Sequence, residues 1–112
     1  MPFSLDDNSL SRDIILKKRI SIQTVFDTGK FDRRKEITLI YIESNSEKVG
    51  FFVHRHSGKA HDRVKYKRWL REIYRTNKSH FKGLKIIFLV KRPIKISFNE
   101  LKSTILSKPL SL

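Results

Sequence analysis

The segment between Asp62 and Lys78 restricts the possible folds most strongly, because its residues repeat with the period of a helix that has one apolar and one cationic side. At about 100° per residue, the two sides separate cleanly. The apolar side consists of Tyr66, Trp69, Leu70, Ile73 and Tyr74, and the cationic side consists of Lys67, Arg68, Arg71, Arg75 and Lys78. We therefore expect a helix over residues 62–78 that packs on a core and presents its cations to solvent.

Three further stretches have the composition of β-strands. Ile37 to Glu43 and Val49 to His54 are rich in β-branched and aromatic residues. The turn-forming residues 44–46 separate them, so two strands joined as a hairpin is the simplest interpretation. Leu84 to Val90 follows Gly83 and is almost continuously apolar, which is typical of a strand buried on both faces.

A short helix is expected before the first of these strands. Ile22, Val25 and Phe26 have helical spacing, and Ser21 can cap the start. Gly29 stands where a left-handed residue would end the helix.

A last helix is expected to begin at Ser97. Ser97 and Glu100 form the S-x-x-E pattern of a capping box, and Phe98, Leu101 and Ile105 form one apolar stripe. Pro109 marks the predicted end. Residues 1–11 have no clear period and are expected to form a poorly ordered tail, which leaves one domain over residues 12–112.

The expected order is helix, strand, strand, helix, strand, helix. This order indicates a small α+β domain in which helices cover one side of a sheet and the other sheet face can stay open. A chain of 112 residues has room for one compact core. If the long helix connects parallel strands, a right-handed crossover is the general expectation.

Positive charge is concentrated in the middle of the chain. Lys and Arg number 25 and Asp and Glu number 11, which gives a net charge of +14. Half of this excess, +7, lies in the 24 residues from Arg55 to Lys78, where nine basic residues accompany only Asp62 and Glu72. A run of charge is usually a solvated helix face, but cations at this density repel one another unless phosphates neutralise them. Backbone N–H groups of Ser57 and Gly58, just before the helix, are candidates for holding a phosphate.

These features predict a protein that binds nucleic acid, and RNA is favoured over DNA. The sequence has neither the ligand spacing of a zinc finger nor a basic leucine zipper. Contacts to phosphates and to the shape of a folded RNA would dominate such an interface. A basic DNA-binding regulator remains an alternative from the residues alone.

The residues do not predict a catalytic or metal site. The chain has no cysteine, which excludes thiol catalysis and disulfides and fits a reducing cytosol. Its carboxylates are scattered singly, apart from the adjacent pair Asp6 and Asp7, whereas a two-metal nuclease needs several that converge. His54, His56 and His61 lack an acidic cluster that would complete a metal site, so contact with phosphate or water is expected. The apolar runs are too short to span a membrane, and the start does not have the pattern of a secretory signal. We therefore expect a soluble, intracellular protein.

Two adjoining stretches, Val49 to Ala60 and Arg63 to Arg75, resemble the bacterial ribonuclease P protein component. In both, a strand with basic residues at its end leads through a Gly-x-Ala turn into a helix with a basic tripeptide. Here the turn is Gly58 to Ala60 and the tripeptide is Arg63-Val64-Lys65. The pattern Lys-Arg-x-x-Arg-x-x-aromatic follows at Lys67 to Tyr74, and the resemblance covers about Arg12 to Lys108.

The resemblance implies a small α-β sandwich whose central sheet is mostly antiparallel and contains an unusual left-handed βαβ crossover. It implies the small subunit of a ribonucleoprotein endonuclease that removes the 5′ leader from precursor tRNA in the cytoplasm. In that family the RNA subunit performs the hydrolysis with Mg²⁺, so no cofactor held by the protein alone is expected. The implied partners are ribonuclease P RNA and the 5′ leader of precursor tRNA. An RNA-binding protein of the ribosomal or assembly type, without a part in cleavage, is the alternative.

The resemblance also implies which residues contact RNA. The expected RNA-binding residues are Arg55, His56, Gly58, Lys59, Arg63, Lys65, Lys67, Arg68, Arg71 and Arg75. The leader is expected in a cleft between the first helix and the sheet, where Phe26 matches an aromatic position and Ile22 occupies another that is commonly aromatic. Val64 stands where the family has Asn, and His56 stands where a second Lys or Arg is usual.

Overall fold

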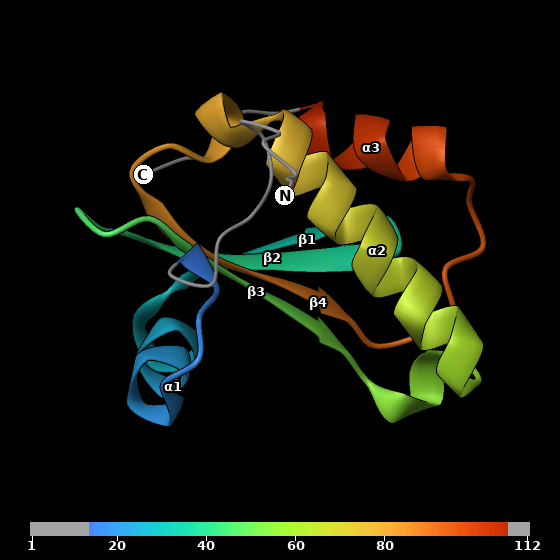
Figure 1. Ribbon diagram of the computed structural model, residues 1–112, viewed down its shortest axis with the longest axis horizontal. Helices are drawn as coiled ribbons and strands as arrows, with labels where there is room; N and C mark the ends of the chain where they lie inside the picture. Colours follow the sequence, from blue (N-terminus) through green and yellow to red (C-terminus); the bar gives the residue numbers. More distant parts are fainter. Residues whose placement is uncertain (1–13, 108–112) are drawn as a thin grey trace, which may run out of the picture.

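The computed structural model describes residues 14–107, which form three α-helices and four β-strands (Figure 1). In chain order these are α1 (Arg19–Thr28), β1 (Lys30–Arg34), β2 (Ile37–Glu43), β3 (Lys48–Val53), α2 (Ala60–Thr76), β4 (Leu84–Val90) and α3 (Phe98–Leu106). The 3-10 turns η2 (Arg55–Ser57) and η3 (Lys78–Phe81) flank α2. The tail expected over residues 1–11 and the stop expected at Pro109 lie outside the described residues.

The four strands form one mixed sheet in the order β1-β2-β4-β3. β1 and β2 pair antiparallel, as do β2 and β4, whereas β3 and β4 pair in parallel. The predicted hairpin between β2 and β3 is therefore wrong, because β4 lies between them. β4 is the most apolar of the strands and takes a central position, where both of its faces are covered. The hairpin in the structure joins β2 to β1, a strand of mostly charged residues that the sequence did not indicate.

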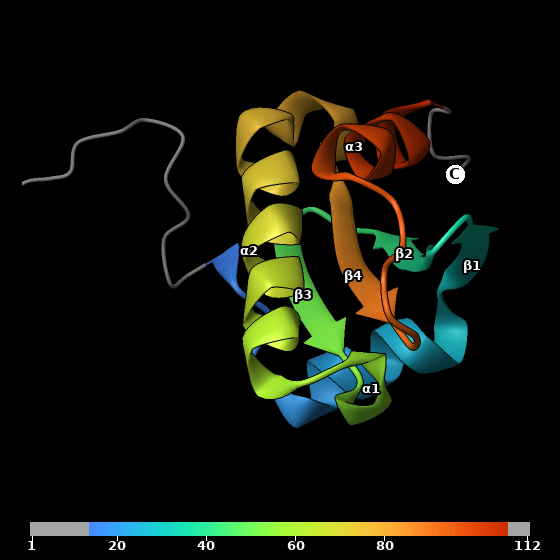
Figure 2. The same cartoon turned by 90° about the vertical axis from the view of Figure 1, so that its right-hand side faces the viewer.

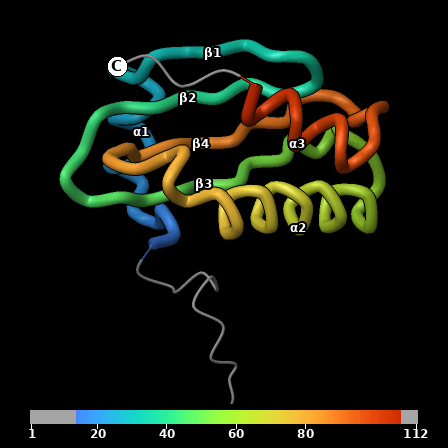
Figure 3. The backbone as a smooth tube through the Cα atoms, turned by 90° about the horizontal axis from the view of Figure 1, so that it is seen from above, coloured from blue at the N-terminus to red at the C-terminus, as the bar shows by residue number. Residues whose placement is uncertain are grey.

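β3, α2 and β4 form a βαβ unit with a left-handed crossover. Figure 1 shows α2 above the sheet, and Figure 3, which is seen from above, shows β3 and β4 both running from left to right with β4 on the α3 side of β3. When these strands are turned to point upward, with α2 toward the viewer, β4 lies to the left of β3. The crossover implied by the resemblance is thus present, and the general right-handed expectation does not hold here.

Helices cover both faces of the sheet rather than one. α2 and α3 pack on the larger core cluster, which includes Leu39 and Phe88 from the sheet and Leu70 from α2. On the opposite face, Val25 of α1 packs against Ile40 and Ile87, so α1 lies on the other side from α2 and α3 (Figures 1 and 2). The expectation that helices cover only one side is therefore wrong. β4 is almost continuously apolar, with Ile86 buried on one face of the sheet and Ile87 on the other. Helices must therefore pack on both faces to remove these side chains from water.

The helix boundaries agree with the sequence in part. α1 begins at Arg19, two residues before the predicted cap Ser21, and Gly29 is extended, with a φ of −75°, rather than left-handed. A glycine is nevertheless required there, because a Cβ on Gly29 would lie 2.4 Å from the carbonyl oxygen of Val25. The predicted capping box of α3 is confirmed, since the Ser97 hydroxyl accepts from the Glu100 N–H and the Glu100 carboxylate accepts from the Ser97 N–H.

Candidate nucleic-acid interface

The basic helix α2 separates its charges from the core as the sequence predicts. Tyr66, Leu70, Ile73 and Tyr74 are buried against the sheet. The exposed residues on the other side include Lys65, Lys67, Arg68 and Arg71. Because the apolar side chains fix the rotation of the helix, these cations are held on one outward surface. We call Lys67, Arg68 and Arg71 the basic face of α2.

The turn that leads into α2 is built around two histidines. The Nδ1 atom of His54 accepts a hydrogen bond from the N–H of His56 at 3.1 Å, and the two rings stack with centres 4.7 Å apart. Arg55, His56 and Lys59 are exposed. The turn thus adds a second group of cations next to the N-terminal end of α2.

The N–H of Ser57 does not contribute to the phosphate site that the sequence suggested, because it already has a partner within the protein. The N–H of Ser57 donates to the carbonyl oxygen of His54, and its buried hydroxyl donates to the carbonyl oxygen of Val90 at 3.0 Å. Gly58 has a φ of 141°, and a Cβ added to it would lie 3.1 Å from the Cβ of Asp62. Both residues therefore shape the turn, and the Asp62 carboxylate lies beside it.

Two of the predicted RNA-binding cations lie over aromatic rings of the protein itself. The Nζ atom of Lys65 lies 5.2 Å from the ring centre of Trp69 and 5.7 Å from that of Tyr66. The guanidinium of Arg71 lies 5.7 Å from the ring centre of Phe51. Lysine and arginine held over aromatic rings keep their charge exposed while their stems cover apolar surface.

Arg75 is held differently, by a carboxylate. Its Nη2 and Nε atoms donate to Glu72 at 2.5 and 3.1 Å, and its side chain is 23% exposed. An arginine whose charge is already matched and which is mostly covered has less to offer a phosphate. Arg75 is therefore less available to RNA than the exposed Lys67, Arg68 and Arg71, and Arg63 is half-buried.

A second surface lies between α1 and the sheet. The rings of Phe26 on α1 and Phe52 on β3 stack with centres 6.1 Å apart and planes 13° apart. Phe26, Phe52 and Ile22 are all partly buried around the smaller core cluster. The two residues expected at a leader cleft thus lie together. Phe52 was missed, although alternation along its strand places it on the face opposite Phe51.

Phe52 belongs to a row of residues that crosses the whole sheet. Arg33 pairs with Thr38, Thr38 with Leu89, and Leu89 with Phe52. We call these four residues the cross-sheet row. It changes from a cation at the β1 edge to an aromatic ring at the β3 edge, where Phe52 meets Phe26.

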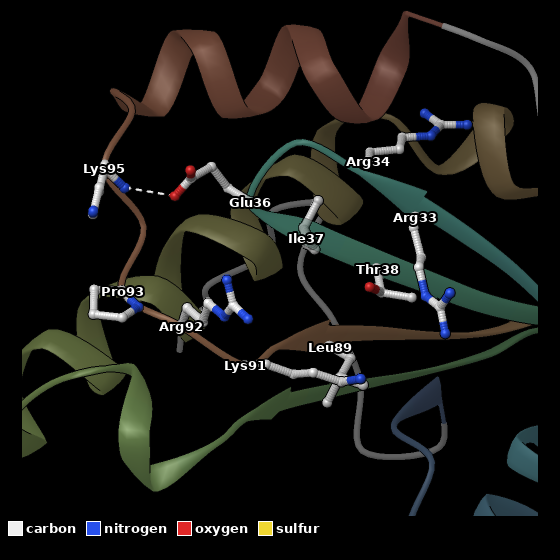
Figure 4. A pocket seen from close by; sticks show the side chains of 10 residues that line it. All are labelled: Arg33, Arg34, Glu36, Ile37, Thr38, Leu89, Lys91, Arg92, Pro93 and Lys95. Carbon is white, nitrogen blue, oxygen red and sulfur yellow. Dashed lines mark hydrogen bonds between the residues drawn. The ribbon is translucent and has the colours of Figure 1, made fainter.

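A pocket of about 420 Å³ opens beside the β1 end of this row. Figure 4 shows Arg33 and Lys91 extending over β4 near Leu89, whereas Arg34 points away toward α3. Arg92 and Lys95 add further positive charge to the lining, and the carboxylate of Glu36 accepts from the N–H of Lys95. The site prediction did not include these cations, because their convergence depends on strand pairing.

Residues 14–107 contain neither a metal-binding cluster nor a membrane-spanning helix. In this part of the chain, no three His, Asp or Glu side chains come together in a group that could hold a metal ion. No helix in the same range is long and apolar enough to cross a membrane.

The fold and the two surfaces define a small α+β domain of the RNA-binding class, with a cationic helix on one face of the sheet and an aromatic and cationic row on the other. The model of the Ribonuclease P family matches residues 10–108. The chain therefore belongs to the ribonuclease P family, as the sequence resemblance indicated.

Two individual relatives support membership of this family. The chain is 34% identical over 85 residues to the ribonuclease P protein component of Natranaerobius thermophilus, covering 73% of this chain and 74% of that protein. It is 29% identical over 100 residues to the component of Finegoldia magna, covering 87% of this chain and 88% of that one.

Solved structures share the fold. The RNase P protein of Thermotoga maritima superposes with a TM-score of 0.71 at 26% identity, over 82% of this chain and 91% of that chain. The RNase P protein of Staphylococcus aureus gives a TM-score of 0.74 at 22% identity, over 82% of this chain and 88% of that chain. These likenesses support the left-handed α-β sandwich described above.

Proposed function

We propose that this chain acts as the protein subunit of ribonuclease P, binding the catalytic RNA and the 5′ leader of precursor tRNA and promoting removal of the leader. The observation that carries this proposal is the basic face of α2, which is exposed along a helix whose other side is fixed in the core. In a member of the ribonuclease P family, such a face is suited to the backbone of the RNA subunit.

In this proposal the RNA subunit carries the hydrolysis, and Mg²⁺ is held mainly by RNA. The protein contributes positive charge where two polyanions, the catalytic RNA and its substrate, must approach each other. A net charge of +14 on a small domain lowers their mutual repulsion and so reduces the need for free Mg²⁺. The work would take place in the bacterial cytoplasm, where tRNA precursors are made.

The cross-sheet row supports a path for the leader. Single-stranded RNA is held by aromatic rings that stack on bases and by cations that follow the backbone. Phe26 and Phe52 offer the rings at one end of the row, and Arg33 with Lys91 offers the cations at the other. We therefore propose that the leader crosses the open part of the sheet, between α1 and the loop that follows β4.

A cleavage assay tests the function. The full chain is added to a bacterial ribonuclease P RNA at a Mg²⁺ concentration too low for the RNA to act alone. Restored cleavage at the 5′ end of the mature tRNA, saturating with protein, is the expected result. A variant in which Lys67, Arg68 and Arg71 are all replaced by alanine serves as the folded control and should stimulate little. Absence of stimulation at every ratio of protein to RNA contradicts the proposal.

The leader path has its own test. Phe52→Ala should weaken the binding of precursor tRNA to the reconstituted holoenzyme about 5- to 150-fold, because one stacking contact is worth roughly 1–3 kcal/mol. The affinity for mature tRNA, which has no leader, should not change. An equal loss for both substrates would show that Phe52 supports the fold or the RNA subunit rather than the leader.

A further inference from the structure

We propose that the pocket at the β1 edge of the sheet binds the 5′-terminal phosphates of a short leader, with a 5′-triphosphate as its preferred ligand. This inference rests on the proposed function, because it places the 5′ end of the leader at the end of the proposed path. Its basis is a cluster of exposed cations that line the pocket. We call them the pocket cations: Arg33, Lys91, Arg92 and Lys95.

The pocket cations have no counterion within the described protein. Among residues 14–107, none of the four forms an ion pair. Arg34 also lines the pocket, but its guanidinium is paired with Asp32 and points toward α3 (Figure 4). Cations gathered around one opening repel one another, so the anion bound most strongly is one that carries several charges close together.

The one carboxylate in the lining fixes the shape of the pocket. The Glu36 carboxylate accepts the N–H of Lys95 at 2.8 Å, which joins the β1–β2 turn to the segment after β4. Glu36 has a φ of 70°, in the left-handed region that residues other than glycine rarely adopt. In the segment after β4, the ring of Pro93 restricts the backbone and Ile94 is buried. The two walls that carry the cations are therefore held together by the protein itself.

Charge density distinguishes a terminal phosphate group from the interior of a leader. Four pocket cations and one carboxylate leave an excess of three positive charges. Each internal phosphodiester brings only one negative charge, and its neighbours lie a nucleotide away. A terminal phosphate carries more than one charge, and a 5′-triphosphate places three phosphates next to one another. The pocket volume of about 420 Å³ lies in the usual range for small-ligand sites.

The topology of the sheet decides which end of the leader reaches the pocket. α2 packs beside β3, with Arg71 over Phe51, and the basic turn follows β3 directly. In the proposed function, the RNA subunit and the cleavage site therefore lie on the β3 side. β1 is the opposite edge of the sheet. A leader that starts at the cleavage site and crosses the sheet brings its 5′ end to the pocket.

The width of the sheet limits this contact to short leaders. The cross-sheet row spans three gaps between neighbouring strands, a length of about 14 Å. A few nucleotides cover this length, and a longer leader carries its 5′ end past the β1 edge. The pocket then receives an internal phosphodiester, and the chemistry of the 5′ end has no effect.

The experiment lets two precursors compete for the holoenzyme reconstituted from the full-length protein and a bacterial ribonuclease P RNA. Both have the same leader, which ends in a 5′-triphosphate in one and in a 5′-hydroxyl in the other, and the ratio of initial rates gives the ratio of kcat/KM. The leader is lengthened one nucleotide at a time. The triphosphate should be preferred about tenfold or more at one short length, the effect of one charge-assisted hydrogen bond, and should not be preferred on long leaders. The RNA subunit alone, at high Mg²⁺, should show no preference.

The combined variant Arg92→Gln and Lys95→Gln should lose the preference for the triphosphate. The combined variant Lys35→Gln and Lys82→Gln is the matched control, because it removes the same charge from exposed positions that do not line the pocket. This control should keep the preference. Absence of a preference at every leader length, or a preference that survives in the pocket variant, overturns the inference.

Free ATP carries the same phosphate group and provides a separate arm of the experiment. Inhibition by ATP that the pocket variant abolishes, without any preference among leaders, assigns the pocket to a free nucleotide and overturns the inference. Stimulation of cleavage at low Mg²⁺ is measured in parallel on a long leader with a 5′-hydroxyl. Retained stimulation without a 5′ preference leaves the proposed function standing, whereas absent stimulation contradicts the function itself.

Discussion

The guanidinium of Arg71 lies 5.7 Å from the ring centre of Phe51, so a cation of the basic face rests on an aromatic side chain of β3. Phe51 is in turn stacked on Phe88, with ring centres 5.7 Å apart, and meets Tyr74 edge to face. The position of Arg71 is therefore set by the aromatic core beneath it. A residue that contacts RNA and a residue of the core are coupled here through one contact.

This contact predicts that substitutions of Arg71 change both stability and RNA binding. Arg71→Ala should lower the free energy of unfolding by about 0.5–1 kcal/mol, the usual value of an exposed cation–π contact, and should also weaken RNA binding. Arg71→Lys lacks the planar group but keeps the charge, so it should retain more of the RNA affinity than Arg71→Ala does. Urea unfolding and RNA binding, measured on the same samples, check this. If Arg71→Ala changes neither quantity, the contact has no energetic role.

The ion pair of Arg75 predicts an order of effects along α2. Arg68→Ala should weaken RNA binding about fivefold or more and leave stability almost unchanged, because Arg68 is exposed and contributes a charge-assisted contact. Arg75→Ala should have a smaller effect on RNA binding, since Glu72 already neutralises it. Glu72→Gln should increase the affinity by releasing Arg75. Filter binding at fixed salt gives the order, and a larger loss for Arg75→Ala than for Arg68→Ala would contradict it.

The contacts of Arg34 predict that its replacement lowers the stability of the fold, although Arg34 has no role in RNA binding. Its side chain is only 6% exposed, and its Nη2 atom lies 2.7 Å from the carboxylate of Asp32. Its Nη1 atom donates to the carbonyl oxygens of Thr104 and Ile105 at the end of α3. Arg34→Met should cost about 1.5–3 kcal/mol, because it leaves the partly buried carboxylate of Asp32 and two carbonyl oxygens of α3 without this donor. The neighbouring Arg33→Met, at an exposed position, should change stability by less than about 0.5 kcal/mol. Similar values for the two variants would exclude the proposed link between β1 and α3.

The raised pKa of Tyr74 predicts that the folded state loses stability at alkaline pH. Burial, together with the nearby carboxylate of Glu47, raises the pKa of Tyr74 from 10.0 to about 12. The folded state therefore favours the protonated phenol, and this contribution is complete below about pH 10 and is lost as the pH rises toward about 12. Tyr74→Phe keeps the ring stacked near Phe81 and removes the ionisable group. Unfolding free energies measured across this range should fall more steeply for the wild-type protein than for the variant. Parallel curves would show that the phenol does not contribute.

Local patterns in the sequence were sufficient for the elements that carry the RNA-binding surface. The spacing of Tyr66, Leu70 and Ile73 fixed the buried side of α2, and the S-x-x-E pattern at Ser97 fixed the start of α3. The bounds of β2 and β4 were also predicted correctly, because their apolar runs end at clear turn residues.

Strand pairing could not be predicted in the same way, because it depends on contacts between distant residues. β1 reads Lys-Phe-Asp-Arg-Arg, which has the charge of a loop, and it forms a strand because an edge strand can keep charged residues in solvent. The placement of β4 between β2 and β3 follows from burial of its two apolar faces. The cross-sheet row and the pocket cations depend on this pairing, so they became visible only in the structure.

The salt dependence of RNA binding tests most directly whether the basic face of α2 neutralises RNA phosphates. The logarithm of the affinity for ribonuclease P RNA should fall linearly with the logarithm of salt concentration, with a slope of several units. Lys67→Ala and Arg68→Ala should each reduce the slope by about 0.7–0.9, the value of one phosphate contact, while Arg75→Ala should reduce it less. A flat response, or a slope that the combined Lys67→Ala and Arg68→Ala variant leaves unchanged, would contradict the assignment of this face to RNA.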